Sequence, residues 1–591
     1  MPPARDAGAA PAGLSSLTRL IPYAAKHRRR YASALGLVLT STLLAVASPA
    51  LVKRAMDAVE SGTGGRALGL LAAALAAAGV ARAFLVFRGR YGLIAASRMI
   101  ENDLRAELFA KLLRLPARFF DENSSGDIAS RVINDVEGVR MVAGIALMMV
   151  VSSGFLFVLS LGSMFLIDHR LTLLALAPLL LVSACTWLLT GRIYAQSETV
   201  QERLSDISTI AQENFSGARV IRAFTRETAE NARFEGSARA YLEANLSLSW
   251  TRGVTWGLMT LLIEATMGVT LLAGGRGLIA GTLSKGDFVA FTAYQFMLAW
   301  PVIAMGWVIT IIQRGAACMD RLSTLLDEAE SFAPVGEGPA APGAIEFRGL
   351  TFRYAPERRP ALEGLSLSIA AGERVAVVGR TGAGKSTLVQ LLLGLYPAPP
   401  GTVLLGGVDV NDWPRQALRE TLSSVSQDVF LFSDTLASNI AFGAAQPVSP
   451  PDVMEAAEAS RLAADLPAFP AGIEQVVGER GITLSGGQKQ RAAIARALIR
   501  RAPVLLLDDA LSSVDVHTER DILERLERWM EGRTCLIVTH RFSVVSRVDR
   551  IVVLDEGRLV EQGTHAELLA KGGLYARLAQ RQRLEEALES Q

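Results

Sequence analysis

The sequence contains little cysteine, with three in 591 residues, at Cys185, Cys318 and Cys535. Their wide separation excludes the paired spacing of a zinc site or a disulfide framework, so we expect them to be small packing residues. The sequence also lacks an excess of either charge. Its formal net charge is +2 at pH 7, which gives no global reason to expect a nucleic-acid partner, although residues 26–30 form a local basic cluster.

Apolar residues, by contrast, are abundant. Half of the sequence is hydrophobic and the mean hydropathy is +0.30, which is too apolar for a chain that is soluble throughout. Long apolar runs, each able to cross about 30 Å of hydrocarbon as a helix, predict six membrane spans at residues 31–52, 67–87, 141–167, 171–193, 254–280 and 288–312. A lipid bilayer is therefore an expected partner of a transmembrane domain at residues 31–330.

The connections between these runs alternate in length. Residues 168–170 form a minimal turn, whereas residues 88–140 and 194–251 are long, charged and helically periodic. This pattern predicts helices that extend well beyond the membrane. At their turning points, residues 119–128 and 213–219 are predicted to form two short coupling helices that contact a soluble domain.

Residues 1–30 are expected to form a loose tail and a short amphipathic helix at the bilayer surface. Their basic residues precede the first apolar run, and positive charge favours the cytoplasmic side. We therefore expect a multi-pass protein of the cytoplasmic membrane, with both termini and the long connections in the cytoplasm. Ala45-Val46-Ala47 also resembles a signal-peptide cleavage site, but an uncleaved first span keeps the number of crossings even.

Glu264 lies within an apolar run, where a charge is costly enough to need a reason. It could bind a cationic substrate or pair with Arg82. A hydrogen bond in helix packing, or a carboxylate that faces a water-filled cavity without touching substrate, is an equally good interpretation.

Residues 331–344, rich in proline and glycine, break the helical pattern and predict a linker to a domain at residues 345–591. In that domain an apolar run at 374–378 precedes a glycine-rich loop and a helix. Glycine lets consecutive backbone N–H groups turn toward phosphate oxygens, while a lysine adds charge and a serine hydroxyl can bind Mg²⁺. The loop predicts a site for a nucleoside triphosphate with Mg²⁺, formed by Gly379, Arg380, Thr381, Gly382, Ala383, Gly384, Lys385, Ser386 and Thr387.

Four more residues are candidates for the same site. Tyr354 precedes the loop, where its ring can stack on a base. Gln427 can reach Mg²⁺ or the attacking water through its amide. Asp508 ends a buried apolar strand, and such a carboxylate can bind Mg²⁺ or its water shell. His540 ends the next apolar strand and could contact the γ-phosphate.

A second loop also suits a phosphate, because a serine hydroxyl and glycine N–H groups open a helix there. One chain cannot easily use both loops on one nucleotide. The simplest arrangement is two chains placed head to tail, so that each nucleotide lies between the first loop of one chain and the second loop of the other. The residues of this second loop are Ser485, Gly486, Gly487 and Gln488.

The order of these motifs resembles that of the ATP-binding cassette (ABC) exporter family, in which six spans precede a nucleotide-binding domain. The resemblance covers nearly the whole sequence and implies an α-helical polytopic membrane domain followed by an α/β P-loop NTPase domain. It also implies a pump in which two nucleotide domains close on ATP and separate after hydrolysis. The matching motifs are Walker A at 379–387, the Q-loop Gln427, the coupling loop 478–481, the signature 484–488, the Walker B Asp508, the D-loop 512–515 and the switch His540.

One residue departs from the family pattern. Asp509 stands where the family has its catalytic glutamate. Its carboxylate is one methylene shorter, and a misplacement of about 1 Å can cost about a hundredfold in rate. We therefore predict slow hydrolysis at this chain's own Walker site, with its intact signature loop completing the site of a partner. This asymmetry resembles the degenerate half of a heterodimeric exporter, and a homodimer in which Asp509 works adequately is the alternative.

The resemblance thus implies ATP-driven export of amphipathic or hydrophobic compounds, either drug-like or lipid, with Asp509, His540 and Gln427 as catalytic candidates. An ATP-gated channel or regulatory subunit is an alternative, motivated by Asp509. A soluble cassette ATPase that acts with nucleic acid conflicts with six apolar spans and gains no support from the net charge.

Overall fold

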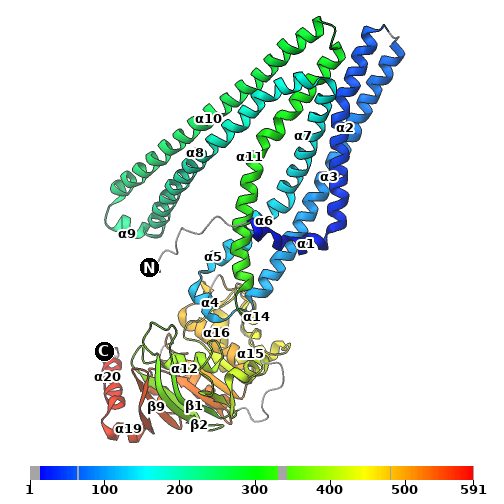
Figure 1. Ribbon diagram of the computed structural model, residues 1–591. Coiled ribbons are helices and arrows are strands. Elements are labelled where there is room, and N and C mark those ends of the chain that lie inside the picture. The colour runs from blue at the N-terminus through cyan, green and yellow to red at the C-terminus, as the bar shows by residue number, and fades with distance from the viewer. Residues whose placement is uncertain (1–13, 63–64, 331–342, 479–480, 515, 590–591) are drawn as a thin grey trace. The chain divides into compact units, whose positions relative to one another are not determined.

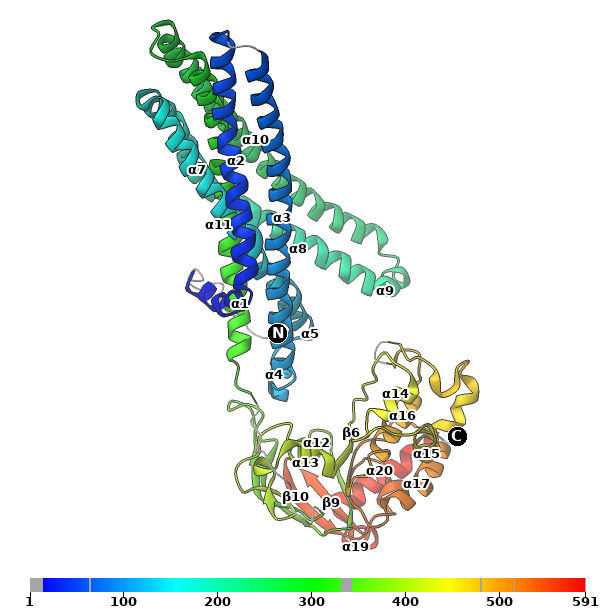
Figure 2. The same ribbon diagram turned by 90° about the vertical axis from the view of Figure 1, so that its right-hand side faces the viewer.

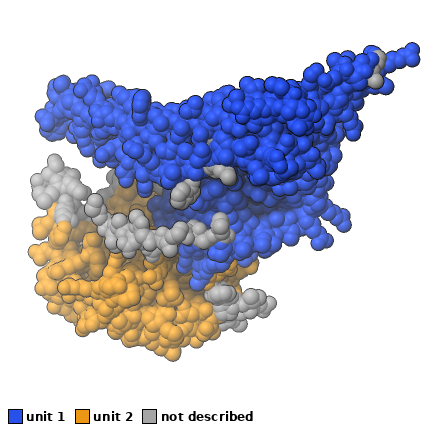
Figure 3. Space-filling view, turned by 45° about the horizontal axis from the view of Figure 1, so that its top comes forward, with its two compact units in different colours: residues 1–114, 123–329 blue, residues 115–122, 330–591 orange. Residues whose placement is uncertain are grey.

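The computed structural model describes residues 14–62, 65–330, 343–478, 481–514 and 516–589. Parts of several sequence predictions therefore lie outside the described residues, namely the tail at 1–13, most of the linker at 331–344, Glu479 and Arg480 of the coupling loop, and Asp515 of the D-loop. The chain divides into two compact units, which Figure 3 draws in two colours. Unit 1 is Met1–Arg114 with Asn123–Ala329, and unit 2 is Leu115–Glu122 with Glu330–Gln591.

Unit 1 is built from helices (Figures 1 and 2). α8 and α10 run along each other and are joined through α9. Two of the long helices begin at good capping residues, since Asp168 accepts the N–H groups of Arg170 and Leu171 at the start of α8, and Ser284 accepts that of Asp287 in α11. The elements are η1 (Leu14–Leu20), α1 (Ile21–Lys26), α2 (Arg28–Glu60), α3 (Gly65–Leu112), α5 (Ser125–Ser130), η2 (Arg131–Asp135), α6 (Val136–Met141), η3 (Val142–Ala146), α7 (Leu147–Ile167), α8 (His169–Ser216), α9 (Ala218–Ala223), α10 (Glu227–Ile279) and α11 (Lys285–Asp327).

The predicted polytopic helical domain is confirmed. Among the described residues, five helical stretches are long and apolar enough to cross a membrane: Arg28–Glu60, Gly65–Leu112, Ser125–Ile167, Glu227–Ile279 and Lys285–Asp327. The remaining predicted span, 171–193, lies within α8, of which several side chains fall outside the described set.

The two predicted coupling helices have different bounds from those expected. Residues 119–128 are not one helix, because α4 (Ala117–Glu122) ends before Ser124, whose side chain caps α5 by accepting the N–H of Asp127 at 3.1 Å. α4 belongs to unit 2, whereas α5 belongs to unit 1. Residues 213–219 are also not the second short helix. α8 continues to Ser216, and α9 follows only after Gly217.

Unit 2 contains two sheets. The first is antiparallel in the order β2-β1-β4-β5, and the second has the order β10-β9-β3-β8-β7-β6, parallel from β9 to β6. Parallel strands bring their carboxyl ends to one edge, where ligands of such sheets bind. The strands are β1 (Ile345–Phe352), β2 (Leu362–Ile369), β3 (Arg374–Gly379), β4 (Val403–Leu405), β5 (Val408–Asp409), β6 (Leu422–Val425), β7 (Val504–Asp508), β8 (Thr534–Val538), β9 (Arg550–Asp555) and β10 (Arg558–Gly563).

The core of unit 2 lies between these sheets and their helices. β7 and β8 are buried along their whole length, as expected for strands covered on both faces. Trp413 is fully buried and its ring N–H donates to the carbonyl of Leu405 at 3.1 Å. The helices are α12 (Lys385–Leu392), η4 (Val410–Asp412), α13 (Arg415–Thr421), α14 (Leu436–Ala441), α15 (Pro450–Ala459), η5 (Leu462–Ala468), η6 (Gly472–Glu474), α16 (Gly486–Leu498), α17 (Val516–Met530), α18 (Phe542–Val545), α19 (His565–Lys571) and α20 (Leu574–Glu589).

Candidate active site

An open cleft of about 470 Å³ lies in unit 2, where β3, β7 and β8 end. It brings together residues that are far apart in the sequence, including most of those predicted for a nucleotide site. The residues that line it are Tyr354, Ala361, Thr381, Gly382, Gly384, Lys385, Ser386, Thr387, Gln427, Asp508, Asp509, Val538 and His540.

The backbone of the glycine-rich loop between β3 and α12 has a conformation that residues with a Cβ atom could adopt only with strain. Gly384 has φ of 92°, and a Cβ atom there would lie 2.4 Å from the carbonyl oxygen of Ala361. Gly384 immediately precedes α12, whose N-terminal N–H groups are free of intrahelical partners by geometry. The loop can therefore bring backbone donors and the positive end of a helix to an anion.

Lys385, the first residue of α12, supplies a cation to this loop. Its Nζ atom donates to the carbonyl oxygens of Gly379 and Arg380, both at 2.9 Å. Burial lowers the pKa of Lys385, and the nearby carboxylates of Asp509 and Asp508 oppose that shift. The ammonium is thus held close to the loop, where it can contact a phosphate. Ala383 packs in the core beneath the loop.

Ser386 and Asp508 form an oxygen pair beside the lysine. The Ser386 hydroxyl donates to Oδ1 of Asp508 at 3.0 Å, and Asp508 is only 5% exposed. Burial raises the pKa of Asp508, while the Ser386 hydrogen bond lowers it. A hydroxyl and a carboxylate are ligands that Mg²⁺ prefers, so these residues fit the ion. The exposed amide of Gln427 lines the same cleft.

Asp509 and His540 also line the cleft, and each lies just after a strand. Asp509 has φ of 49°, and its N–H donates to the carbonyl of Val538 at 2.9 Å. This left-handed turn carries its carboxylate out of the buried strand. Partial burial and the charge of Lys385 lower the pKa of His540, against the opposing effect of Asp509. The neutral imidazole is therefore the favoured form near pH 7, able to donate or accept a hydrogen bond.

Tyr354 occupies another wall of the cleft and is half-buried. Its hydroxyl hydrogen bonds with Oγ1 of Thr387 at 3.0 Å and with Oε1 of Gln390 at 2.5 Å. Its ring packs edge to face with those of Phe352 and Tyr396. The ring is thus held in a fixed position from which it can contact a flat base.

The second predicted phosphate loop is not part of this cleft. Ser485 caps α16 by accepting the N–H of Gln488 at 3.3 Å, and the Gln488 side chain accepts the N–H of Ser485 at 3.0 Å. A Cβ atom on Gly487 would lie 3.1 Å from the backbone oxygen of Ser513, which is closer than most such contacts, so glycine eases the approach of the two segments. Ser485, Gly486, Gly487 and Gln488 therefore form a preorganised helix N-terminus that is absent from the lining of the cleft in their own chain.

Sequence reasoning missed a polar network that holds this second loop. The Gln490 side chain donates to Ser512 Oγ at 2.7 Å and accepts the N–H of Ser513 at 2.8 Å. Arg541, directly after His540, donates to the carbonyls of Ser512 and Val514, both at 2.9 Å, and pairs with the buried Glu519. Only the adjacency of Arg541 to His540 could have suggested a role, because the pairing depends on the folded D-loop.

Unit 1 has a cavity of its own, of about 510 Å³. Two arginines of α3, Arg82 and Arg90, line it together with apolar and hydroxyl side chains. Arg82 was predicted as a partner of Glu264, but Glu264 is exposed and is not among the residues lining this cavity. The other lining residues are Val38, Ser41, Thr42, Ala45, Val86, Ile94, Ile145, Met148, Met149, Ser152, Ser153, Leu156, Trp300 and Trp307.

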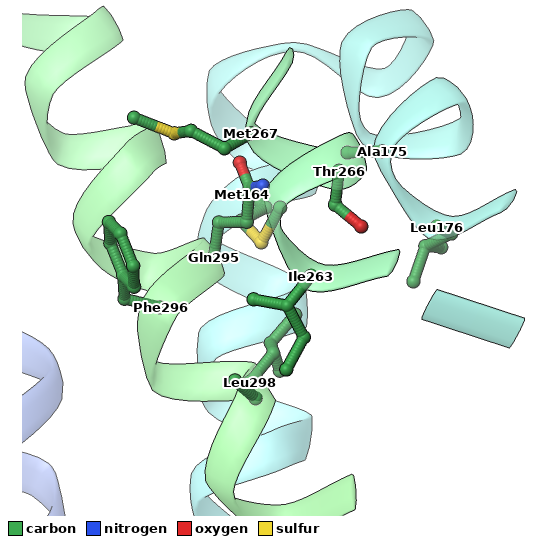
Figure 4. Close-up of a pocket in the computed structure, with 10 residues that line it drawn as sticks. Met164, Ala175, Leu176, Ile263, Thr266, Met267, Gln295, Phe296 and Leu298 are labelled. Carbon is green, nitrogen blue, oxygen red and sulfur yellow. The ribbon is translucent and has the colours of Figure 1, made fainter. Parts of the chain in front are cut away.

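A second hollow in unit 1 is small and apolar, with a volume of about 20 Å³ (Figure 4). Thr266 and Gln295 are the polar residues in its lining. Gln295 Oε1 accepts a hydrogen bond from Thr270 at 2.7 Å, which satisfies the amide oxygen beside Met267 and Phe296. This hollow has room for about one water molecule, so we regard it as a packing defect between helices rather than a substrate site.

The fold and cleft define the class: a P-loop ATPase joined in one chain to a helical membrane domain. Comparison with known families refines it. Residues 33–302 match the model of the ABC transporter transmembrane region, and residues 362–512 match that of the ABC transporter. The chain belongs to the ABC transporter family, and is a multi-pass membrane ATPase that couples hydrolysis to transport.

Curated relatives and a solved structure resemble nearly the whole chain. It is 38% identical over 493 residues to the ATP-dependent lipid A-core flippase of Aromatoleum aromaticum, covering 83% of this chain and 82% of the relative. It is 34% identical over 569 residues to that of Nitrosococcus oceani, covering 96% and 95%. A bacterial Atm1-family ABC exporter with ATP bound matches with a TM-score of 0.78 and 30% identity, covering 94% of this chain and 98% of the other.

Proposed function

We propose that the chain exports an anionic, lipid-like amphiphile by hydrolysing ATP. The observation that carries this proposal is the cavity of unit 1, in which Arg82 and Arg90 lie among apolar side chains. The relatives named as lipid A-core flippases support a lipid substrate. A cavity lined by both cationic and apolar side chains matches a molecule with an anionic head and a hydrocarbon tail.

The arginines of α3 differ in their partners. Arg98 and Arg105 pair with the buried Glu101 at 2.7 and 2.8 Å. Arg82 and Arg90 have no carboxylate within salt-bridge distance among the residues that the structure describes. Arg82 lies within the predicted span 67–87, where a guanidinium is costly unless it is paired or hydrated, and Arg90 lies three residues beyond that span in the same cavity. A substrate phosphate or carboxylate could supply the missing negative charge. This favours an anionic substrate over the cationic one considered for Glu264.

ATP would occupy the cleft of unit 2. The Tyr354 ring would contact the adenine, and Lys385 with the loop N–H groups would hold the phosphates. Ser386, Gln427 and Asp508 would hold Mg²⁺, which would neutralise negative charge on the phosphates. Asp509 would orient the attacking water, and His540 would contact the γ-phosphate. A shorter carboxylate at 509 makes this site slow.

A second chain would complete each site. The preorganised loop at residues 485–488 does not line the cleft of its own chain, and it could contact the nucleotide in a partner's cleft. Apolar side chains near α9 are highly exposed in the single chain, with Phe215 82% and Phe224 73% exposed, and such surface is usually covered by another protein. We infer a dimer with the N-terminus and unit 2 on the cytoplasmic side. Because the short carboxylate of Asp509 is expected to make this chain's Walker site slow, we infer that the partner is a different half-transporter with a faster site. A homodimer is the alternative.

The substrate proposal can be tested with two lipids that share one tail. The chain, alone and with candidate partner half-transporters, is placed in lipid nanodiscs, and ATP turnover is measured with lysophosphatidic acid or lysophosphatidylcholine. We expect stronger stimulation by the anionic lipid, and loss of that preference in the double variant Arg82→Gln/Arg90→Gln. Equal stimulation by both lipids, or an unchanged preference in the variant, would overturn the assignment.

The transport proposal has a separate test. Sealed vesicles containing the protein are given either ATP or a non-hydrolysable analogue. Uphill movement of a labelled anionic lipid that needs ATP hydrolysis supports an exporter. A passive conductance opened equally by the analogue would instead make the chain an ATP-gated channel.

A further inference from the structure

Three aromatic rings form a cluster beside the cleft of unit 2. Phe352 ends β1, Tyr354 follows it, and Tyr396 lies after α12. The ring centroids of Tyr354 and Tyr396 are 5.1 Å apart with an interplanar angle of 89°, and those of Phe352 and Tyr396 are 6.3 Å apart. Edge-to-face packing of this kind is directional, so a displacement of one ring changes its contact with the next.

The other end of Tyr396 reaches the segment Leu115–Glu122. Its hydroxyl donates a hydrogen bond to Oδ2 of Asp121 in α4. This segment belongs to unit 2, although the chain on both sides of it belongs to unit 1. Burial and the Asp121 carboxylate raise the pKa of Tyr396, so the hydroxyl stays protonated and remains a donor.

Tyr354 in turn is fixed to the phosphate-binding helix. Its hydroxyl contacts Thr387 and Gln390 of α12, the helix that begins at Lys385. One face of the cleft, the ring of Tyr396 and the carboxylate of Asp121 are therefore joined by consecutive contacts within one compact unit.

We propose that Tyr396 is a positioning residue that transmits the occupancy of the base-binding wall of the cleft to the segment Leu115–Glu122. The proposal rests on the proposed binding of ATP in that cleft. A base docked on Tyr354 restricts its ring, the edge-to-face contact then restricts Tyr396, and the hydroxyl holds Asp121 in place. The phosphates alone, bound at Lys385, reach the hydroxyl of Tyr354 through α12 but leave its ring unrestricted. Because coupling between sites is reciprocal, the Asp121 contact should also strengthen nucleotide binding.

The route predicts a difference between two probes that share phosphates but not a base. Amide hydrogen exchange of the full-length protein in nanodiscs is followed by mass spectrometry with saturating Mg²⁺ and either AMP-PNP or inorganic tripolyphosphate. Both should slow exchange in the loop at residues 379–387, which reports binding itself. Only AMP-PNP should slow exchange at residues 115–122. Equal protection of 115–122 by both probes would overturn the proposal.

Variants then test the residue. Tyr396→Phe keeps the ring and removes the hydroxyl, and Asp121→Ala removes its acceptor. In each, AMP-PNP at saturation should still protect 379–387, while the protection of 115–122 falls about fivefold and the Kd for AMP-PNP rises by the same factor. The double variant should be no worse than either single one, because both remove one contact.

A matched control exists in unit 1, where the Tyr23 hydroxyl donates to Oε2 of Glu107 at 2.6 Å. Tyr23→Phe removes the same kind of bond away from the cleft and should leave the protection of 115–122 unchanged. Full AMP-PNP protection of 115–122 in Tyr396→Phe would refute the relay. If AMP-PNP failed to slow exchange at residues 379–387 in the wild-type protein, nucleotide binding at this cleft would be refuted instead.

Discussion

The cleft of unit 2 and the cavity of unit 1 are both hollow and partly charged, but they are built differently. The cleft gathers short motifs that each begin where a strand ends, so that Lys385, Asp508 and His540 meet at one edge of a sheet. The cavity takes two to five side chains from each of the long helices α2, α3, α7 and α11. A site made of local motifs can be predicted from the sequence, whereas a site made of scattered helix positions requires the packing.

Their charges differ as well. In the cleft, burial lowers the pKa of Lys385 against the opposing charges of Asp509 and Asp508, and burial raises the pKa of Asp508 against the opposing charge of Lys385. In the cavity, Arg82 and Arg90 bring charge of one sign, with hydroxyl and apolar neighbours. A site with both positive and negative side chains suits the hydrolysis of a phosphate bound with its metal ion. A site with positive side chains alone suits the reversible binding of an anion that is not chemically changed.

The largest expected effect is the loss of ATP turnover when the cleft loses its lysine. Lys385→Ala should lower ATP turnover about a thousandfold, because a preorganised charge at the phosphates is removed. Phosphate release in nanodiscs measures the change. Lys571→Ala is a suitable control, since Lys571 Nζ also donates to a backbone carbonyl in unit 2, that of Gln562 at 3.4 Å. Retention of more than about a tenth of the wild-type rate would contradict the role of the loop in catalysis.

The second-largest expected effect is a gain of ATP turnover in the cleft. Asp509→Glu should raise turnover at this chain's own Walker site, by up to about a hundredfold, because the longer carboxylate regains the lost distance to the water. Single-turnover hydrolysis with the chain expressed alone measures it. Asp521→Glu, at a surface pair with Arg461, controls for added length. An unchanged or lower rate in a folded variant would argue against the short-carboxylate explanation, and full exporter rates in the unmodified chain alone would argue against a heterodimer.

A smaller effect is expected on the apparent affinity of the unit 1 cavity for an anionic lipid. Arg82→Gln and Arg90→Gln should each weaken the apparent affinity for lysophosphatidic acid about tenfold, since each removes one charge-assisted hydrogen bond. The lipid concentration for half-maximal stimulation of ATP turnover gives this value, and basal turnover should be unaffected. Arg88→Gln lies on the same helix but outside the lining, so it should have no effect. A similar loss in Arg88→Gln would point to surface charge in general.

The smallest effect concerns the scaffold of the cleft. Arg374 of β3 binds Asp549 before β9 with an N–O distance of 2.7 Å, and this hydrogen bond lowers the pKa of Asp549. A lowered folded-state pKa adds stability above the unfolded value of about 4, and the added stability is lost as the pH falls through the folded value. Because both groups are partly exposed, Asp549→Asn should cost at most about 1 kcal/mol at pH 7.

Thermal unfolding of the wild type and of Asp549→Asn at several pH values tests this sign. The difference in Tm should be greatest near neutral pH and shrink under acid conditions. A difference that grows as the pH falls would show that the carboxylate destabilises the fold.

Several features of unit 2 could be predicted because their chemistry is local. The loop at Lys385 and the capped helix at Ser485 each need only neighbours in the sequence, and the structure puts Tyr354, Gln427, Asp508, Asp509 and His540 on the same cleft. The separation of the two loops within one chain also agrees with the expectation that no single nucleotide would use both.

The sequence-based predictions were wrong or incomplete where tertiary contacts determine the structure. The break between α4 and α5 depends on the Ser124 cap, and the place of α9 depends on how far α8 continues. Neither the Arg541–Glu519 pair nor the Tyr396–Asp121 contact follows from periodicity, because each joins residues distant in the sequence. The sequence predicted Glu264 as a possible substrate contact and Arg82 only as its possible partner, yet Arg82 lines the cavity together with Arg90, which the sequence did not single out, and Glu264 does not.

The central claim, that ATP hydrolysis in the cleft moves an anionic amphiphile through the membrane domain, is tested most directly by translocation in proteoliposomes. The movement of fluorescent phosphatidylglycerol between leaflets is measured with ATP, beside fluorescent phosphatidylcholine, in the wild type and in Lys385→Ala. We predict ATP-dependent movement of the anionic lipid that exceeds that of the zwitterionic lipid and vanishes in the variant. Movement that is equal for the two lipids, or that persists in Lys385→Ala, would contradict the account.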